Sequence, residues 1–188
     1  FTVRSIAGHD TGGYSEHMRR TVFLCALGVA IAVPAAGLAA HLAAGDGTLV
    51  VKNGSAPRGT PVITLVIRGA AIGQITGGGK IVIDDPTPGD GAGPEASGFG
   101  WHKSADTVDT WGGTEPFRFR AVGGVYKITI YGSGVDLVAS GRGTVVLAGS
   151  VDIPARDGQY SLNGGDFRSL PALPTKQLTI SVPPSATG

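Results

Sequence analysis

The sequence predicts an all-β fold, either an antiparallel β-sandwich or a partly closed barrel. Apolar and polar residues alternate in several short runs, as where Ile128 and Ile130 are flanked by Lys127 and Tyr131, and this period of two is typical of strands with one buried face. Glycine-rich turns separate the runs. No stretch after residue 40 has a helical period, and 32 glycines disfavour helices. A β-solenoid is the alternative, because glycine-punctuated strands also suit coils.

Residues 18–40 are expected to form an apolar leader helix. Arg19 and Arg20 precede a long apolar run, an order that is typical of a secretory signal peptide. Small residues at Gly37 and Ala39 fit a signal-peptidase site and favour cleavage. The alternative is an uncleaved membrane anchor, because the run approaches the roughly 20 residues that span a bilayer.

The boundaries of the other segments follow from composition. Residues 1–17 show no periodicity and are expected to be an unstructured segment upstream of a translation start at Met18. Residues 46–182 form a single predicted β-domain, and residues 183–188 a disordered tail. The one cysteine, Cys25, lies in the leader. We therefore expect the β-domain to have no disulfide and to be stabilised by its apolar core.

The charge of the chain is nearly balanced, with a formal net charge of +1. Arg4, Arg19 and Arg20 outnumber Asp10 and Glu16 before residue 41 and account for the whole excess. No basic stripe is left in the β-domain, so nucleic-acid binding is not expected. The protein is expected to be secreted or held in the cell envelope, and to contact membrane only through an uncleaved leader.

Two segments of the β-domain, residues 60–84 and 123–148, resemble each other and predict a pair of pseudo-repeated β-meanders. Each has three apolar runs and two glycine-rich breaks, with Gly69 matching Gly132 and Gly78 matching Gly141. We expect three short strands joined by two tight turns in each copy. The alternative is that any two glycine-punctuated meanders look alike.

Further strands are expected before, between and after the two copies. An Asp-Gly pair leads into the first, which an Asn-Gly turn closes. The strand of residues 117–120 alternates Phe with Arg, so its arginines should face water or a ligand. The last two strands are expected from a run that ends at a glycine-rich turn and from a run that lies between prolines. The expected ranges are 48–52, 117–120, 159–162 and 177–182.

Residues 84–115 lack any period and are predicted to be a long irregular loop. Loops of this length in a compact domain are often functional. Both tryptophans of the chain lie here, and indole rings can stack on sugars while neighbouring polar groups bind hydroxyls. The alternative is that both rings fold back as a lid over the core. The candidate ligand-binding residues are Trp101, His102, Asp106, Asp109, Trp111, Arg118 and Arg120.

Aspartates in the loops offer a possible calcium site. Asp84, Asp85 and Asp90 lie close together in sequence, as do Asp152 and Asp157, and Ca²⁺ favours carboxylate and carbonyl oxygens on loops. The alternative is ordinary turn chemistry, because aspartate beside proline or glycine is common in turns. No other cofactor is expected.

No catalytic motif is recognisable, including G-x-S-x-G and H-E-x-x-H, so no catalytic residue is assigned. We therefore expect a non-catalytic binding or structural module of the cell envelope or extracellular space, with a glycan or a protein as ligand. The alternative is a hydrolase or lyase acting on an extracellular polymer, with His102 as its base and the Asp-rich loop beside it.

Overall fold

The computed structural model describes residues 43, 45–150 and 158–182, and this part of the chain is entirely β, as predicted. The leader of residues 18–40, the segment upstream of it, the tail, and Asp152 with Asp157 lie outside the described residues. No helix in the described part is long and apolar enough to cross a membrane. The strands are β1 (Gly47–Gly54), β2 (Ile63–Ile75), β3 (Gly79–Asp84), β4 (Ala92–Ser97), β5 (Trp101–Ala105), β6 (Val108–Gly113), β7 (Phe117–Gly132), β8 (Val135–Leu147), β9 (Gln159–Leu162), β10 (Arg168–Ser169) and β11 (Leu178–Ile180).

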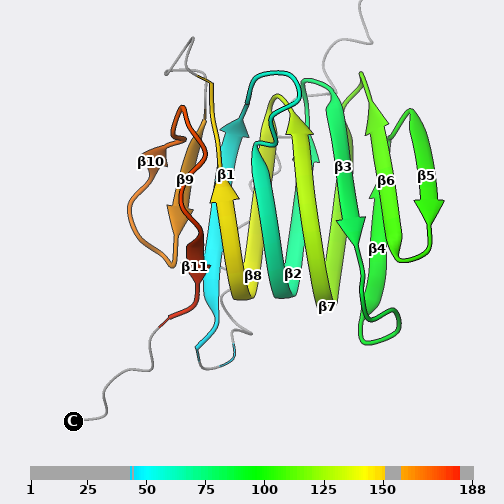
Figure 1. Ribbon diagram of the computed structural model, residues 1–188, viewed down its shortest axis with the longest axis horizontal. Helices are drawn as coiled ribbons and strands as arrows, with labels where there is room; N and C mark the ends of the chain where they lie inside the picture. Colours follow the sequence, from blue (N-terminus) through cyan, green and yellow to red (C-terminus); the bar gives the residue numbers. More distant parts are fainter. Residues whose placement is uncertain (1–42, 44, 151–157, 183–188) are drawn as a thin grey trace, which may run out of the picture. The chain divides into compact units, whose positions relative to one another are not determined.

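The strands form one sheet in which every ladder is antiparallel. Their order is β10-β9-β1-β8-β2-β7-β3-β6-β5, with β11 added to β8 and β4 added to β7 (Figure 1). Among the described residues no strand joins β10 to β5, so the sheet is not closed. The prediction of an antiparallel all-β fold is confirmed at this level.

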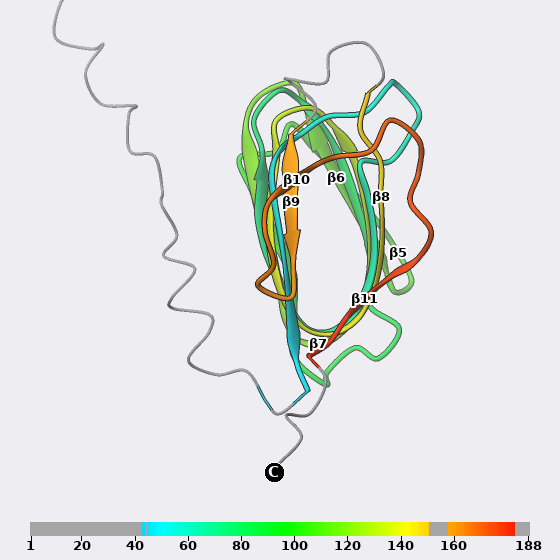
Figure 2. The ribbon, with the colours of Figure 1, turned by 90° about the vertical axis from the view of Figure 1, so that its left-hand side faces the viewer.

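The sheet folds over on itself because its three longest strands bend in the middle (Figure 2). The first half of β2 pairs with the second halves of β7 and β8, and its second half pairs with their first halves. Two layers result. We call layer A the one that contains β3, β5, β6 and β11, and layer B the one that contains β1, β4, β9 and β10; β2, β7 and β8 run through both.

The bends fall on glycines that are aligned across the sheet. Gly69 of β2 lies opposite Gly124 of β7 and Gly141 of β8. Gly69 and Gly141 have φ values of 149° and 137°. A Cβ on Gly141 would lie 2.1 Å from the carbonyl oxygen of Arg68, so the backbones approach too closely at the bend for any side chain.

The prediction of tight turns at Gly69 and Gly141 is therefore wrong, because both glycines lie inside continuous strands. Glycine at positive φ can reverse a chain, but it can also bend a strand whose ladder continues on both sides. The matched residues are not equivalent: Gly69 is at a bend inside β2, whereas Gly132 ends β7 before the connection to β8. Residues 76–78 and 133–134 join strands that do not pair with each other, and each connection passes from one layer to the other. Duplication of the two segments stays a prediction.

The predicted irregular loop of residues 84–115 is also wrong in part, since it contains β4, β5 and β6. Strand β5 lies at the edge of the sheet, and all five of its residues are exposed, so it has no apolar alternation to detect. Strand β4 carries Gly93 and Pro94, which are both rare inside strands. These strands form because neighbours pair with them, which local sequence does not reveal.

The hydrophobic core lies between the two layers. Alternation along each strand points every second residue inward, and the sheet bends so that these inward rows face one another (Figure 2). The inward side chains are almost wholly excluded from water. The largest are Tyr126, Phe117, Leu49, Ile63, Leu65, Ile67, Ile75, Ile81, Ile83, Ile128, Ile130 and Leu137.

Candidate functional site

The β5–β6 hairpin at the edge of layer A carries five of the predicted site residues and divides them between two faces. Trp101 lies opposite Gly112, and His102 opposite Trp111. Opposed residues share a face and successive residues alternate. Trp111 is 4% exposed and points inward, whereas Trp101 is 43% exposed and points outward. Of the two indole rings, that of Trp111 therefore packs against the core, as the lid interpretation expects, and that of Trp101 is exposed.

On the inward face, His102 is held by three neighbours. Its ring stacks on Trp111, with centroids 4.9 Å apart and planes within 4°. The ring of Phe99 lies near it at a tilt, with centroids 5.9 Å apart and planes at 59°. Its Nε2 lies 2.8 Å from Oδ1 of Asp109. His102 is thus paired with Asp109, and this contact fixes the position of the imidazole ring.

The His102–Asp109 pair contains two of the three groups of a nucleophile–base–carboxylate arrangement. A carboxylate that holds an imidazole can orient it as a general base, but covalent catalysis also needs a nucleophile within hydrogen-bond reach. Among the described residues, Asp109 is the one hydrogen-bond partner found for His102. A cavity of about 300 Å³ lies elsewhere, lined by Gln74, Ser97, Gly98, Pro116, Phe117 and Arg118. The contacts of the hairpin therefore fix the orientation of the His102 ring.

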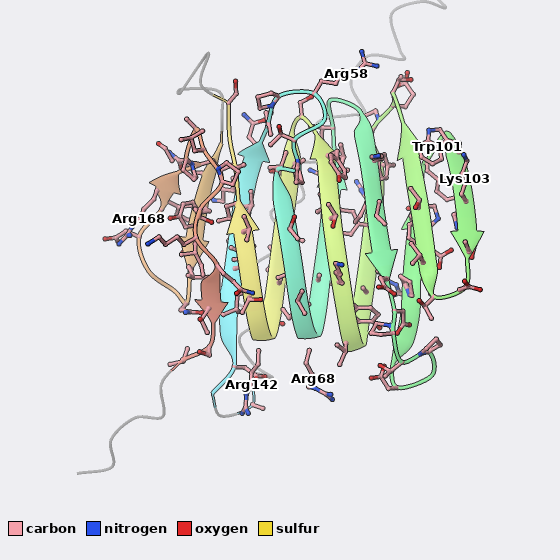
Figure 3. All side chains as sticks on the ribbon, in the orientation of Figure 1. Arg58, Arg68, Trp101, Lys103, Arg142 and Arg168 are labelled. Carbon is pink, nitrogen blue, oxygen red and sulfur yellow. The ribbon has the colours of Figure 1, made fainter. Side chains whose placement is uncertain are left out.

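On the outward face, the indole ring of Trp101 covers Gly112. A Cβ on Gly112 would meet Cζ2 of the ring at 2.4 Å, so only glycine leaves room for the ring to lie there. One face of the indole is thus supported by the sheet, and the residue remains 43% exposed. Figure 3 shows Trp101 and Lys103 together on β5. Such an arrangement presents a fixed aromatic surface to solvent.

The register places further polar and aromatic side chains beside Trp101. One row across β5, β6, β3 and β7 consists of Trp101, Gly112, Lys80 and Tyr131. The ammonium group of Lys80 lies 4.5 Å above the Tyr131 ring, which is the geometry of a cation–π contact. The next row holds Lys103, Thr110, Val82, Thr129 and Thr64. We call the surface formed by Trp101, Lys80, Tyr131, Lys103, Thr110 and Thr129 the platform.

Of the six platform residues, only Trp101 is a candidate ligand-binding residue from the sequence. The other members come from β3, β5, β6 and β7, and they become neighbours only through the register of the sheet. The available signal was alternation, which places Lys80 and Tyr131 on the polar face of strands whose isoleucines are buried. Alternation shows that these residues face outward, but not that they share a row.

The predicted arginines lie on another surface. Arg118 and Arg120 point outward from layer B, where β7 pairs with β4. Nε of Arg120 lies 2.9 Å from Oε2 of Glu95. This hydrogen bond and the attraction between the charges lower the pKa of the Glu95 carboxyl and raise the pKa of Arg120. Because both side chains are fully exposed, the pair should add little stability.

The remaining candidate aspartates lie at the end of β3 and in the connections around β4, β5 and β6. Asp106 lies in the turn between β5 and β6 with φ of 51°, a turn position that aspartate tolerates. Asp84 accepts a hydrogen bond from Thr107 at 2.8 Å, and Asp90 accepts one from Thr87 at 2.7 Å. Asp85 is buried. Among the described residues, no group of three His, Cys, Asp or Glu side chains is placed to hold a metal, and the calcium site of Asp84, Asp85 and Asp90 stays a prediction.

Comparison of the chain with protein-family models, curated proteins and solved structures found no match. The class of protein is therefore defined by its fold and surface. The described part of the chain is an open, folded-over antiparallel sheet with an outward aromatic and polar surface on layer A, and with a His–Asp pair on the inward side of the β5–β6 hairpin.

Proposed function

We propose that this protein is an exported, non-catalytic module that binds a glycan chain in the cell envelope or extracellular space. The observation that carries the proposal is Trp101, whose ring rests on Gly112 and keeps 43% of its surface exposed. A supported indole offers an apolar face to the C–H groups of a sugar at little entropic cost. Export rests on the signal-like pattern of residues 18–40. In architecture, we class the folded-over sheet as a β-sandwich.

The charge of the platform favours an acidic glycan. Lys80 and Lys103 belong to it, and Lys127 lies on the same face, where Asp84 is opposite to it. Positive charges thus outnumber negative ones on this face, and ammonium groups pair well with carboxylates. Trp101 and Tyr131 are three strands apart, which is roughly 14 Å. This span suits a chain of several sugars better than a single ring.

The proposal is tested by measuring binding to a polyuronate, a carboxylate-bearing polysaccharide, by affinity electrophoresis and calorimetry. Replacing Trp101 with alanine should weaken binding by about tenfold or more, since a stacking contact of about 1.4 kcal/mol corresponds to that factor. The matched control is Phe167→Ala. Phe167 is 45% exposed, close to the exposure of Trp101, but it lies beside layer B. Like Tyr131 of the platform, its ring carries a lysine ammonium at 4.5 Å.

Binding that is unchanged by Trp101→Ala, or weakened as much by Phe167→Ala, would contradict the proposal. Equal retention on a neutral polysaccharide would contradict the charge argument. A wild-type protein that binds no glycan but captures a protein through the platform would favour a protein ligand instead.

A second candidate is a hydrolase or lyase that acts on the same class of polymer through His102 and the neighbouring aspartates. The observation in its favour is the 2.8 Å contact between His102 and Asp109. This candidate expects the wild-type protein to release fragments from the polyuronate, and His102→Gln to abolish release without affecting binding. The module proposed above expects no fragments from either protein.

A further inference from the structure

One carboxylate in this structure is buried without a partner. Asp85 follows β3, and because Asp84 lies opposite Lys127, Asp85 comes next to Tyr126, which points into the core. Asp85 is 6% exposed, and its Oδ1 has no hydrogen-bond partner. Its backbone N–H donates a hydrogen bond to the carbonyl oxygen of Thr107, at 2.9 Å. Buried carboxylates are costly unless they are paired or bind an ion.

Several oxygen atoms lie around the side chain of Tyr126, the neighbour of Asp85 across the ladder. The Tyr126 hydroxyl lies 2.8 Å from the carbonyl of Ala92 and 3.1 Å from that of Val122. A Cβ on Gly124 would lie 2.6 Å from Oδ1 of Asp90 and 2.8 Å from the Tyr126 hydroxyl. The carboxylate of Asp90 and the hydroxyl of Tyr126 therefore lie beside the same glycine. We call this place, where β7 bends, the corner.

The Tyr126 hydroxyl lies within electrostatic range of both carboxylates. Burial raises the pKa of its hydroxyl, and the negative charges of Asp85 and then Asp90 raise it further. Both carboxylates thus act on the same hydroxyl. In the described part of the chain, no Lys, Arg or His forms an ion pair with either aspartate.

We propose that Asp85 and Asp90 bind a hard divalent cation of the Ca²⁺ type at this corner. Calcium takes six to eight oxygen ligands from carboxylates, carbonyls and water. Two carboxylates would balance its charge, and the carbonyl of Ala92 and the hydroxyl of Tyr126 are neutral oxygens within the same corner. No sulfur or imidazole contributes, which makes zinc a poor fit. The site is separate from the platform and goes beyond the proposed glycan binding.

The position of this site gives the ion a structural role. Residues 85–91 connect β3 in layer A to β4 in layer B. Val122, Gly124 and Tyr126 belong to the bend of β7, where its register with β2 shifts. An ion held by Asp85 and Asp90 would join the crossover loop to this bend. It should therefore raise thermal stability and protect the exposed loop residues from proteolysis.

The test is thermal unfolding of the full chain with and without about 10 mM CaCl₂, compared with NaCl of equal ionic strength. If the dissociation constant is about 1 mM, as in extracellular calcium modules, the melting temperature should rise by roughly 3–5 °C. Terbium, a luminescent substitute for calcium, should also be sensitised, because Tyr126 borders the site.

Three substitutions separate a site from a general effect of charge. Asp85→Asn and Asp90→Asn should each abolish the calcium shift and the terbium signal. Asp84→Asn is the control, since Asp84 adjoins Asp85 but is bonded to Thr107, and it should keep both. Without calcium, Asp85→Asn should be at least as stable as wild type, because it removes a buried charge.

The proposal is overturned if calcium has no effect on the wild-type protein, if NaCl gives the same shift, or if Asp84→Asn loses the response as fully as Asp90→Asn. Should Asp85→Asn not fold, Asp90→Asn decides the question, because Asp90 is exposed and its replacement leaves the core intact.

Discussion

Replacing Gly141 with alanine is expected to lower the free energy of unfolding by roughly 3 kcal/mol or more. Gly141 has φ of 137° in the bend of β8. A Cβ there would lie 2.1 Å from the carbonyl oxygen of Arg68 and 3.0 Å from Cα of Gly69. Both contacts are with backbone, which cannot rotate away. Urea unfolding at equilibrium measures the loss.

The matched control is Gly59→Ala. Gly59 also has a positive φ, 88°, but a Cβ there would meet nothing within 4 Å. Gly59→Ala should lower the free energy of unfolding by only about 1 kcal/mol, because only the positive φ is unfavourable for alanine. Equal losses for the two variants would show that close backbone approach does not constrain the bend, and would contradict our account of how the sheet folds over.

Replacing Trp111 with alanine should lower the free energy of unfolding by about 3–5 kcal/mol, as expected for a buried tryptophan. The ring is 4% exposed and belongs to the core. It also supports His102, which stacks on it at 4.9 Å. We therefore expect a large fall in the urea midpoint of Trp111→Ala and a loss of the ordered His102 ring signals in NMR spectra.

Trp101→Ala provides the comparison for Trp111→Ala. Its ring lies outside the core, so its removal should change stability by roughly 1 kcal/mol or less. If the two replacements destabilise the protein equally, Trp101 is a structural cover over Gly112 and not a ligand-binding ring. A stable Trp101→Ala variant would instead make its binding defect interpretable.

Much of the fold follows from patterns that are local in sequence. Strands with one buried face, such as Phe117–Arg120 within β7, are predicted because alternation requires only the strand itself. The difference between a turn and a bend at Gly69 or Gly141 is not local. Positive φ suits both outcomes, and the pairing of β2 with β7 and β8 decides between them.

The candidate site was predictable as a list of residues but not as a surface. Trp101 and His102 are adjacent in sequence and were expected to act together, yet in a strand they point to opposite faces. The sequence does not reveal this difference in facing, because β5 has no apolar alternation that would mark it as a strand. Lys80 and Tyr131 join Trp101 only across three strands, so no local motif connects them.

The central claim is that the outward face of layer A binds a glycan. NMR titration of the labelled protein with a polyuronate oligosaccharide tests it most directly. The account predicts shifts at the Trp101 indole N–H and at the amides of Lys80 and Lys103, with Arg120 and Phe167 unaffected. Shifts that concentrate at His102, or at the cavity beside Arg118, would contradict it.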